Sequence, residues 1–287
     1  MGITVIDLYE TGFCVADNRK FSVLISVYIN DPLEQLVSAV ESVIDQSRPP
    51  DQLVIVFDGP VSDQVKEFVE SLKPGKKILC TVLDLKNNVG LGVALKNGLE
   101  HCEHDLVARM DADDISVATR FEQQLDFLRD HPEISVVGGN IIEFNEHSTL
   151  GARGVAQEPK DVMRMARHRN PVNHVTVMFR KTAVLAAGGY RNFPTYEDYD
   201  LWIRMIRASF LIFNLSSDLV FVRAGNDMAN RRRGFQYLKN DFRFFLYLYK
   251  TRFISVLDFG LALLIRIPAR LGGRSVTKLI YSLVRKR

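Results

Sequence analysis

The feature that most constrains the fold of this 287-residue chain is an alternation of short apolar segments with segments of helical periodicity. Residues 21–28, 52–57, 77–83 and 105–110 are apolar on both faces, which predicts strands buried on both sides of a parallel sheet. Intervening segments such as 33–44 place their apolar residues on one helical face. This alternation predicts an α/β fold with a mixed, mostly parallel sheet covered by helices.

The pattern is less regular after residue 110. Further strands are predicted at 135–144 and 175–179, separated by a loop with a short helix at 149–169. A helix is predicted from about 116 to 129.

Acidic residues follow two of the predicted strands. Asp111, Asp113 and Asp114 lie within four positions after one strand, and Asp58 follows another. Ligands of open α/β sheets bind at the carboxyl ends of the strands. Two carboxylates in close contact repel by ~4 kcal/mol at an effective dielectric constant of ~20, so a cation is expected among them. Oxygen ligands suit Mg2+ or Mn2+. A turn and a helix cap at Asp114 is the alternative interpretation.

A second acidic group begins a predicted helix that runs to about residue 208. It contains Glu197, Asp198 and Asp200, and acids in a first helical turn also interact favourably with the helix dipole. Trp202, the only tryptophan of the chain, lies four residues after Asp198 on the same helical face. We expect it to form a wall against a sugar ring.

Other common sites are excluded by their spacing. Gly90 and Gly92 lack the third glycine of a dinucleotide fingerprint, and no P-loop motif occurs. The His and Cys residues of 101–104 have no second ligand pair, so zinc is not expected. Three cysteines without motif spacing, and a start that lacks the pattern of a signal peptide, predict a cytoplasmic protein with reduced thiols.

Charge divides the chain into an acidic body and a basic tail. Residues 228–287 contain 14 Lys or Arg and two Asp, a net charge of +12, so the total of +3 leaves about −9 for the rest. The tail predicts an anionic membrane surface as partner, with the apolar segment 253–265 too short to span a bilayer. A basic stripe of Arg266, Arg270, Arg274 and Lys278 would face the head groups. Packing on the body or on a second copy of the chain is the alternative, and nucleic acid is not expected.

Together these residues resemble the family 2 glycosyltransferases, which are inverting nucleotide-sugar transferases of the GT-A fold. The similarity spans about residues 21–225, so we expect a catalytic domain at 1–225 and an amphipathic helical tail at 226–287. It rests on Ser26, Tyr28 and Asn30; Asp58; Asn87 and Gly90 with Lys96; Asp111 and Asp113; and Glu197, Asp198 and Trp202.

The resemblance implies a role for each matching residue. Ser26, Tyr28 and Asp58 would hold the base of the nucleotide, Asp111 its ribose, and Asp113 a Mn2+ or Mg2+ ion. Asp198 would be the general base, with Glu197 and Trp202 contacting the acceptor or the sugar. Lys96 replaces the commoner Arg and offers the nucleotide a point charge rather than a bidentate contact.

One metal ligand of the family has no counterpart in the sequence. The His often found after the last core strand is absent from 221–225, which leaves a third metal ligand unassigned. His174 could substitute, although a packed or hydrogen-bonded His before a strand is the other interpretation.

The expected function is metal-dependent transfer of a sugar, with UDP-sugars favoured as donors, to a lipid-linked saccharide in bacterial surface polysaccharide synthesis. The enzyme would then lie peripherally on the inner face of the cell membrane, where Arg231 to Arg233 could bind the acceptor pyrophosphate. Two rival functions are a non-catalytic nucleotide-sugar-binding protein and a sugar nucleotidyltransferase.

Overall fold

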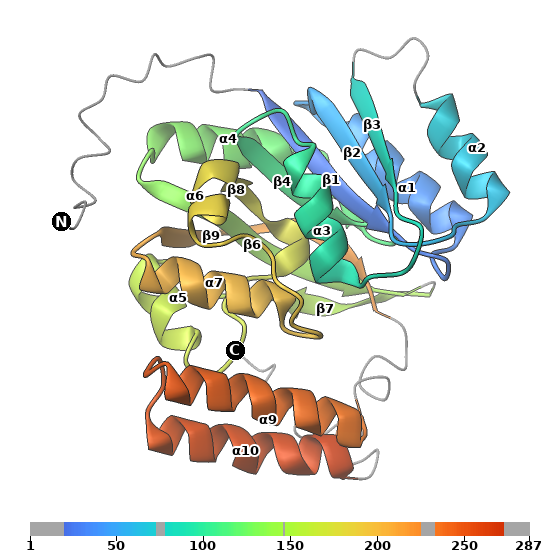
Figure 1. The fold of residues 1–287 in the computed structure, drawn as a ribbon. Helices are drawn as coiled ribbons and strands as arrows, with labels where there is room; N and C mark the ends of the chain where they lie inside the picture. Colours follow the sequence, from blue (N-terminus) through green and yellow to red (C-terminus); the bar gives the residue numbers. More distant parts are fainter. Residues whose placement is uncertain (1–19, 73–77, 146, 225–232, 273–287) are drawn as a thin grey trace.

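Strands and helices alternate along the chain and assemble into one mixed sheet with helices on both faces (Figure 1). The computed structural model describes residues 20–72, 78–145, 147–224 and 233–272. Its strands are β1 (Phe21–Val27), β2 (Gln52–Phe57), β3 (Leu79–Asp84), β4 (Leu106–Asp111), β5 (Ile115–Ser116), β6 (Ile134–Phe144), β7 (Thr149–Arg153), β8 (Met178–Arg180) and β9 (Leu211–Arg223). Its helices are α1 (Leu33–Ile44), α2 (Asp63–Ser71), α3 (Leu91–Glu100), α4 (Arg120–Asp130), α5 (Pro159–Met165), α6 (Lys181–Ala186), α7 (Glu197–Arg207), α9 (Phe235–Lys250) and α10 (Val256–Leu271), with a short 3-10 helix η2 (His174–Thr176).

The sheet has a parallel and a mixed half. The strand order is β3-β2-β1-β4-β8-β6-β9-β5, with β7 paired to β6. The β1, β2, β3 and β4 strands pair in parallel, as do β6 and β9, whereas β8 is antiparallel to both β4 and β6. The predicted α/β fold with a mixed sheet is therefore confirmed.

Both faces of the sheet are buried, as the apolar segments predict. Successive side chains of a strand point to opposite faces. Val23 and Ile25 of β1 pack in the same core as α1, α2 and α4, whereas Leu24 packs in the core that contains α3, α6 and α7. This double coverage explains why the strand segments are apolar throughout instead of alternating.

Three predicted boundaries are wrong. Ile115–Ser116 pairs with β9, so the following helix begins at Arg120 rather than at about 116. Residues 149–153 form β7 against β6 rather than a loop. The segment at 175–179 begins with η2, so β8 starts at Met178. Local periodicity does not encode the distant pairing of β5 with β9, and β7 is too exposed to show an apolar pattern.

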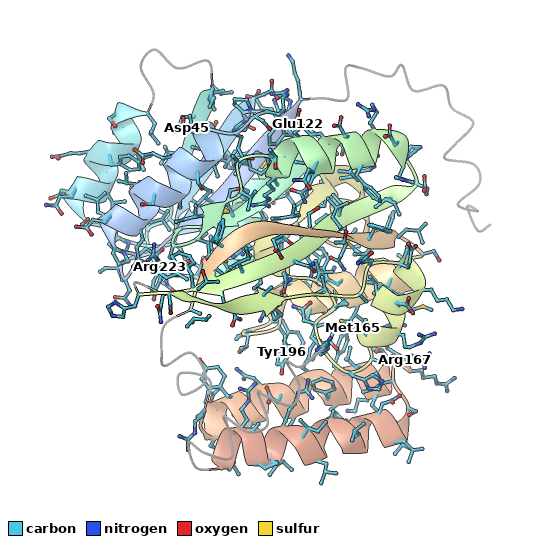
Figure 2. The ribbon with its side chains drawn as sticks, turned by 180° about the vertical axis from the view of Figure 1, so that it is seen from behind. Asp45, Glu122, Met165, Arg167, Tyr196 and Arg223 are labelled. Atoms are coloured by element: carbon cyan, nitrogen blue, oxygen red, sulfur yellow. The ribbon has the colours of Figure 1, made fainter. Side chains whose placement is uncertain are left out.

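The last two described helices form a hairpin that packs on α7, with α10 as its outermost helix (Figure 1). Phe244 and Phe245 of α9 share a buried cluster with Tyr196, at the start of α7, and with Tyr199 of that helix. Figure 2 shows Tyr196 at this junction, seen from behind. For residues 233–272, packing on the body is therefore what the structure shows. Within the described ranges, every helix is too short or too polar to cross a bilayer.

The cations of α10 face the protein rather than the outside. The Arg266 guanidinium lies 3.9 Å from the centre of the Phe245 ring and donates to the His168 carbonyl. Arg270 pairs with the fully buried Asp241. The predicted outward-facing stripe is therefore wrong for these two residues, while Arg274 and Lys278 lie outside the described residues.

The outward face of α10 is apolar instead. Its exposed side chains include Leu257 and Leu264, which are 81% and 71% exposed. Further exposed apolar residues of this helix are Val256, Leu261, Ile265, Ile267 and Leu271. The helix starts with a capping box between Ser255 and Asp258, and it continues through Pro268 to Leu271 rather than breaking at the proline.

Candidate active site

Residues predicted to bind a ligand gather at the carboxyl ends of β1, β2 and β4. In the sheet register Ser26 lies opposite Asp111, and Asp58 directly follows the last residue of β2. Because β1 is flanked by β2 on one side and β4 on the other, this edge is a topological switch point, where α/β sheets bind ligands. Tyr28 follows β1 with a partly exposed ring, and Lys96 lies on the exposed side of α3.

Asp58 holds the loop that leads into α3. Its two carboxylate oxygens accept the backbone N–H groups of Val89 and Gly90, at 2.7 and 3.1 Å, and the side chain is buried. The next residue, Gly59, has a φ of +87°, and a Cβ there would lie 2.6 Å from the Asn88 nitrogen. The carboxylate is thus a structural anchor in this state, and its contact with a nucleotide base stays a prediction.

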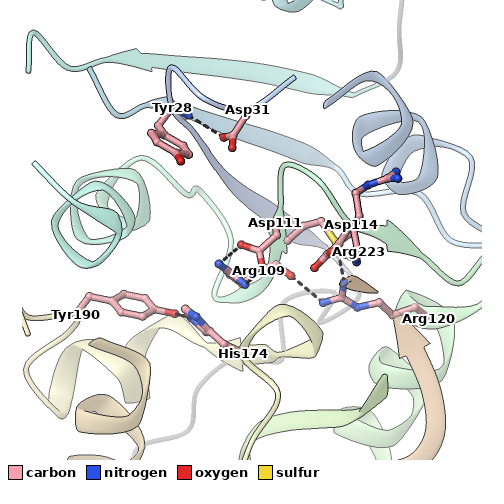
Figure 3. A network of polar contacts seen from close by, with 10 residues as sticks. Tyr28, Asp31, Arg109, Asp111, Asp114, Arg120, His174, Tyr190 and Arg223 are labelled. Carbon is pink, nitrogen blue, oxygen red and sulfur yellow. Dashed lines mark hydrogen bonds and ion pairs between the residues drawn. The ribbon is translucent and has the colours of Figure 1, made fainter. Parts of the chain in front are cut away.

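Arg109 pairs with Asp111 inside the site. The two residues lie two positions apart on β4, so their side chains share one face of the sheet. Arg109 Nη1 donates to Asp111 Oδ2 at 2.6 Å, and Nη2 donates to the other oxygen (Figure 3). Arg109 is buried, and its Nε has no hydrogen-bond partner among the described residues. Sequence reasoning missed this arginine, although its position before three acids was a usable signal.

Four carboxylates crowd the same edge. Burial, followed by the charges of Asp111 and Asp113, raises the pKa of Asp114 to about 8. Burial and Asp111 also raise the pKa of Asp113. Burial raises the pKa of Asp31 to about 6, and the charges of Asp113 and Asp111 add to that rise, although the Tyr28 N–H lowers it. Asp31 follows the end of β1, so the rule that ligands bind at the carboxyl ends of strands, which selected Asp58 and Asp111, would also have selected Asp31.

Asp114 does not cap a helix. The helix α4 begins six residues later with Thr119 in the N-cap position, and Asp114 Oδ1 instead accepts the backbone N–H of Arg223 at 2.8 Å. The interpretation of Asp114 as a cap is therefore wrong, because β5 intervenes between the acids and the helix. The aspartate ties the end of β9 to the acidic edge.

The second acidic group lies in the first turn of α7. Asp198 Oδ2 accepts from Asn170 Nδ2 at 2.5 Å, and Oδ1 accepts from the Tyr199 N–H at 2.7 Å. Burial raises the pKa of Asp198, whereas the donors Asn170 and Tyr199 and the charge of Arg109 lower it. Burial, followed by the charge of Asp198, raises the pKa of Glu197 to about 7.

Arg109 is the cation that both acidic groups share. It pairs with Asp111, and its charge also lowers the pKa values of Glu197 and Asp198. The charge of Asp111 acts in turn on Glu197. The structure therefore brings the acids of β4 and those of α7 together around Arg109. The spacing of these acids in the sequence does not by itself predict that they lie close together.

His174 and Trp202 pack against each other, and His174 lies close to Arg109. His174 Nε2 lies 2.9 Å from the Tyr190 hydroxyl (Figure 3), and burial and Arg109 hold the pKa of His174 well below its usual value. The packed, hydrogen-bonded interpretation of His174 is the one that the structure shows. Trp202 is fully buried against His174 and the α3–α7 core, so the prediction that it forms a wall for a sugar is wrong. Because Trp202 follows the acids of the first helical turn, its position in the sequence does not indicate that it is buried.

The acidic edge suits a metal ion held jointly with a substrate. Among residues with a described placement, no three His, Cys, Asp or Glu side chains could hold a metal on their own. Mg2+ and Mn2+ are commonly held by one or two carboxylates plus substrate phosphate oxygens. Asp113 fits that role because no described side chain donates a hydrogen bond to its carboxylate, whereas Asp111 is engaged by Arg109.

Comparisons with known proteins agree with one another. The sequence model of glycosyl transferase family 2 matches residues 22–185. The amylovoran biosynthesis glycosyltransferase AmsE of Erwinia amylovora is 39% identical over 93% of this chain and 99% of its own length. The UDP-Gal:alpha-D-GlcNAc-diphosphoundecaprenol beta-1,3-galactosyltransferase of Escherichia coli is 32% identical over 94% of this chain and 98% of its own.

Solved structures share the fold. S. aureus TarS 1-349 in complex with UDP-GlcNAc superposes with a TM-score of 0.60 and 19% identity, over 79% of this chain and 66% of that one. The mannosyltransferase PcManGT from Pyrobaculum calidifontis in complex with GDP-Man and Mn2+ gives a TM-score of 0.56 and 14% identity, over 92% of this chain and 79% of that one.

Proposed function

The chain belongs to glycosyl transferase family 2 and has the GT-A fold, and on this premise we propose that it is an inverting transferase that moves a sugar from a nucleoside diphosphate to a hydroxyl group. As a glycosyltransferase it is neither a mere nucleotide-sugar-binding protein nor a sugar nucleotidyltransferase, the two rivals that the sequence left open.

The proposed reaction needs one base. The acceptor O–H gives its proton to Asp198, and its oxygen bonds to the anomeric carbon on the face opposite the diphosphate. The bond from that carbon to the diphosphate oxygen breaks, and the nucleoside diphosphate leaves with the electron pair. Attack from the opposite face inverts the anomeric centre. A glycosidase, by contrast, needs two carboxylates that flank the bond.

The observation that carries this proposal is the shared position of the two acidic groups around Arg109. Asp111 at the end of β4 pairs with Arg109, and the charge of Arg109 also lowers the pKa of Asp198 at the start of α7. A donor bound at the strand ends would therefore lie beside a carboxylate held by two hydrogen bonds. Burial raises the pKa of that carboxylate, which strengthens it as a base.

The donor would bind along the strand ends, with UDP-sugars as the first candidates. Ser26, Tyr28 and Asp58 would face the base, Asp111 the ribose, and Lys96 would add positive charge. Asp113 would hold Mg2+ or Mn2+, which when bound neutralises charge on the diphosphate leaving group. The ligands of two solved structures with this fold support this assignment: TarS was solved with UDP-GlcNAc, and PcManGT with GDP-Man and Mn2+.

The acceptor would be a lipid-linked saccharide of a surface polysaccharide at the inner face of the membrane. The names of two relatives support this class, since one is an amylovoran biosynthesis enzyme and the other acts on a diphosphoundecaprenol-linked sugar. Glu197, beside the base, would contact the acceptor or the sugar. Arg233 donates to the Gly272 carbonyl, while Arg231 and Arg232, the other proposed pyrophosphate ligands, lie outside the described residues.

The hairpin of α9 and α10 would rest on an anionic bilayer. The exposed leucines of α10 supply apolar surface, and the exposed charges of α9 are the cations Lys239, Arg243 and Lys250. Across 233–272 no carboxylate is well exposed, because Asp241 is buried and Asp258 caps its own helix. Apolar residues beside cations are the pattern of helices that lie in a membrane interface.

The test is a transfer assay with the purified protein. UDP-, GDP- and dTDP-sugars are screened with Mn2+ for thermal stabilisation, and each stabilising donor is offered with a diphosphate-lipid-linked saccharide. Asp198→Asn should retain the stabilisation by the donor and lose transfer by 100-fold or more. Asp161→Asn, an exposed acid in the first turn of α5, is the matched control and should transfer normally. Full transfer by Asp198→Asn would refute the assignment of the base.

A further inference from the structure

Asn170 contacts the proposed base from a separate segment of the chain. It lies between α5 and η2, and its Oδ1 accepts the Val172 N–H at 3.3 Å. That contact fixes which end of the amide faces which partner, so Nδ2 points at Asp198 Oδ2, 2.5 Å away. A carboxamide can donate only through its nitrogen, so this arrangement suits an ionised Asp198.

The segment that carries Asn170 is held on its carboxyl-terminal side by buried polar side chains. Asn173 Nδ2 donates to the Gly139 carbonyl at 2.9 Å, and Asn214 Nδ2 donates to the Pro171 carbonyl at 3.2 Å. Thr176 Oγ1 donates to the Asn173 carbonyl at 2.7 Å. These contacts join the segment to β6 and β9, so the Asn170 amide is presented by a fixed backbone.

The same segment is braced on its amino-terminal side. The Tyr199 hydroxyl, from α7, donates to the Ala166 carbonyl at 2.8 Å. Arg266, from α10, donates to the His168 carbonyl at 3.1 Å. The residues before Asn170 are therefore held both by the helix that carries Asp198 and by the hairpin.

The two donors leave Asp198 with free acceptor capacity. A carboxylate offers about four lone-pair sites, and the Asn170 side chain and the Tyr199 N–H each occupy one, on different oxygens. We propose that Asn170 is a positioning residue that holds Asp198 in one orientation, with its remaining lone pairs available to the acceptor hydroxyl. This inference rests on the proposed function, in which Asp198 is the base.

The hydrogen bond from Asn170 affects the pKa of Asp198, together with the other groups around this carboxylate. Asp198 is faced by Glu197 on its own helix, by the Tyr190 and Tyr199 hydroxyl groups, and by Arg109 from β4. Burial raises its pKa and Asn170 is the first of the groups that lower it. Loss of the Asn170 donor should therefore raise the pKa of Asp198. Less of the base is then ionised at neutral pH, and the acidic limb of the rate profile moves to higher pH.

The experiment measures kcat and the donor KM against pH for the wild type and three variants. Asn170→Ala should lower kcat at neutral pH by about 10- to 100-fold, as for a lost hydrogen bond to a charged group, with the donor KM unchanged. Its acidic limb should lie at higher pH than that of the wild type. Asn170→Ser, which keeps a donor, should recover part of both effects. Asn192→Ala removes an exposed asparagine near α7 and should behave as the wild type.

The outcomes separate this inference from the proposed function. A wild type that transfers, together with an Asn170→Ala variant that keeps the wild-type kcat and acidic limb, overturns the role of Asn170 alone. A change in donor KM without a change in kcat overturns it as well. If Asn170→Ala does not fold, Asn170→Gly, which also lacks the donor, takes its place and is judged by the same changes in kcat and acidic limb. A wild type without transfer, or an active Asp198→Asn, overturns the assignment of the base and with it this inference.

Discussion

Replacement of Arg270 by Ala should destabilise the helical hairpin, because it breaks a buried ion pair between α10 and α9. Asp241 is fully buried, and it accepts from Arg270 Nε at 2.8 Å, from Arg270 Nη2 at 3.3 Å and from the Tyr196 hydroxyl at 2.6 Å. Without the arginine, the Tyr196 hydroxyl is the one side-chain donor to this buried carboxylate among the described residues. Breaking a buried ion pair from one side costs about 3–5 kcal/mol.

Urea unfolding and thermal unfolding measure that cost. At about 2–4 °C per kcal/mol for domains of about 150–250 residues, Arg270→Ala should lower Tm by roughly 6–20 °C. Hydrogen exchange should show that α9 and α10 lose protection before the sheet does. The double variant Arg270→Met with Asp241→Leu should be more stable than Arg270→Ala, because no buried charge is left unpaired.

An exposed arginine of the same hairpin provides the control. Arg243→Ala, on the outward side of α9, should change stability by no more than about 0.5 kcal/mol. If the free energy of unfolding of Arg270→Ala lies within about 1 kcal/mol of that of Arg243→Ala, the argument that Asp241 depends on Arg270 is refuted.

Three further predictions concern the site and the hairpin surface. Asp113→Asn should abolish the Mn2+-dependent part of donor stabilisation in a thermal shift assay, and it should raise the stability of the ligand-free protein because repulsion with Asp111 is relieved; unchanged Mn2+ dependence would contradict the metal assignment. Because folding raises the pKa values of Asp31, Glu197 and Asp114 to about 6, 7 and 8, the folded state binds more protons than the unfolded state above about pH 4. Ligand-free stability should then fall as pH rises from about 4 to about 8, and Asp114→Asn should flatten this dependence in urea unfolding at several pH values. Leu257→Glu and Leu264→Glu should each weaken co-sedimentation with vesicles that contain anionic lipid by about tenfold or more, whereas Leu185→Glu, at a half-exposed leucine of α6, should not.

The parallel half of the fold could be predicted from the sequence because its signal is local. Each strand of that half is apolar on both faces, and each following helix repeats its apolar residues at helical spacing. The β5 and β7 strands could not be predicted in this way. The two-residue β5 depends on pairing with β9, which lies far away in the chain, and β7 is mostly exposed and so shows no apolar pattern of its own.

The acidic groups of the site were also visible in the sequence, but not what surrounds them. The rule that strand ends bind ligands selected Asp58 and Asp111, and the same rule applied to β1 would have selected Asp31. Arg109 was hidden within an apolar segment, and Asn170 within a polar loop, where neither has a periodic pattern. Trp202 was misplaced because helical spacing gives a common face but does not say whether that face meets solvent or the core.

The position of the hairpin bears on how this protein can be shortened. The helix that carries Asp198 in its first turn also presents Tyr199 and Ile203 to the hairpin, and both are buried there. A chain truncated at residue 225 would expose Tyr199 and Ile203, along with Tyr196, and we expect it to aggregate when expressed. The boundary at which the basic tail begins in the sequence is therefore not a boundary at which the folded enzyme can be cut.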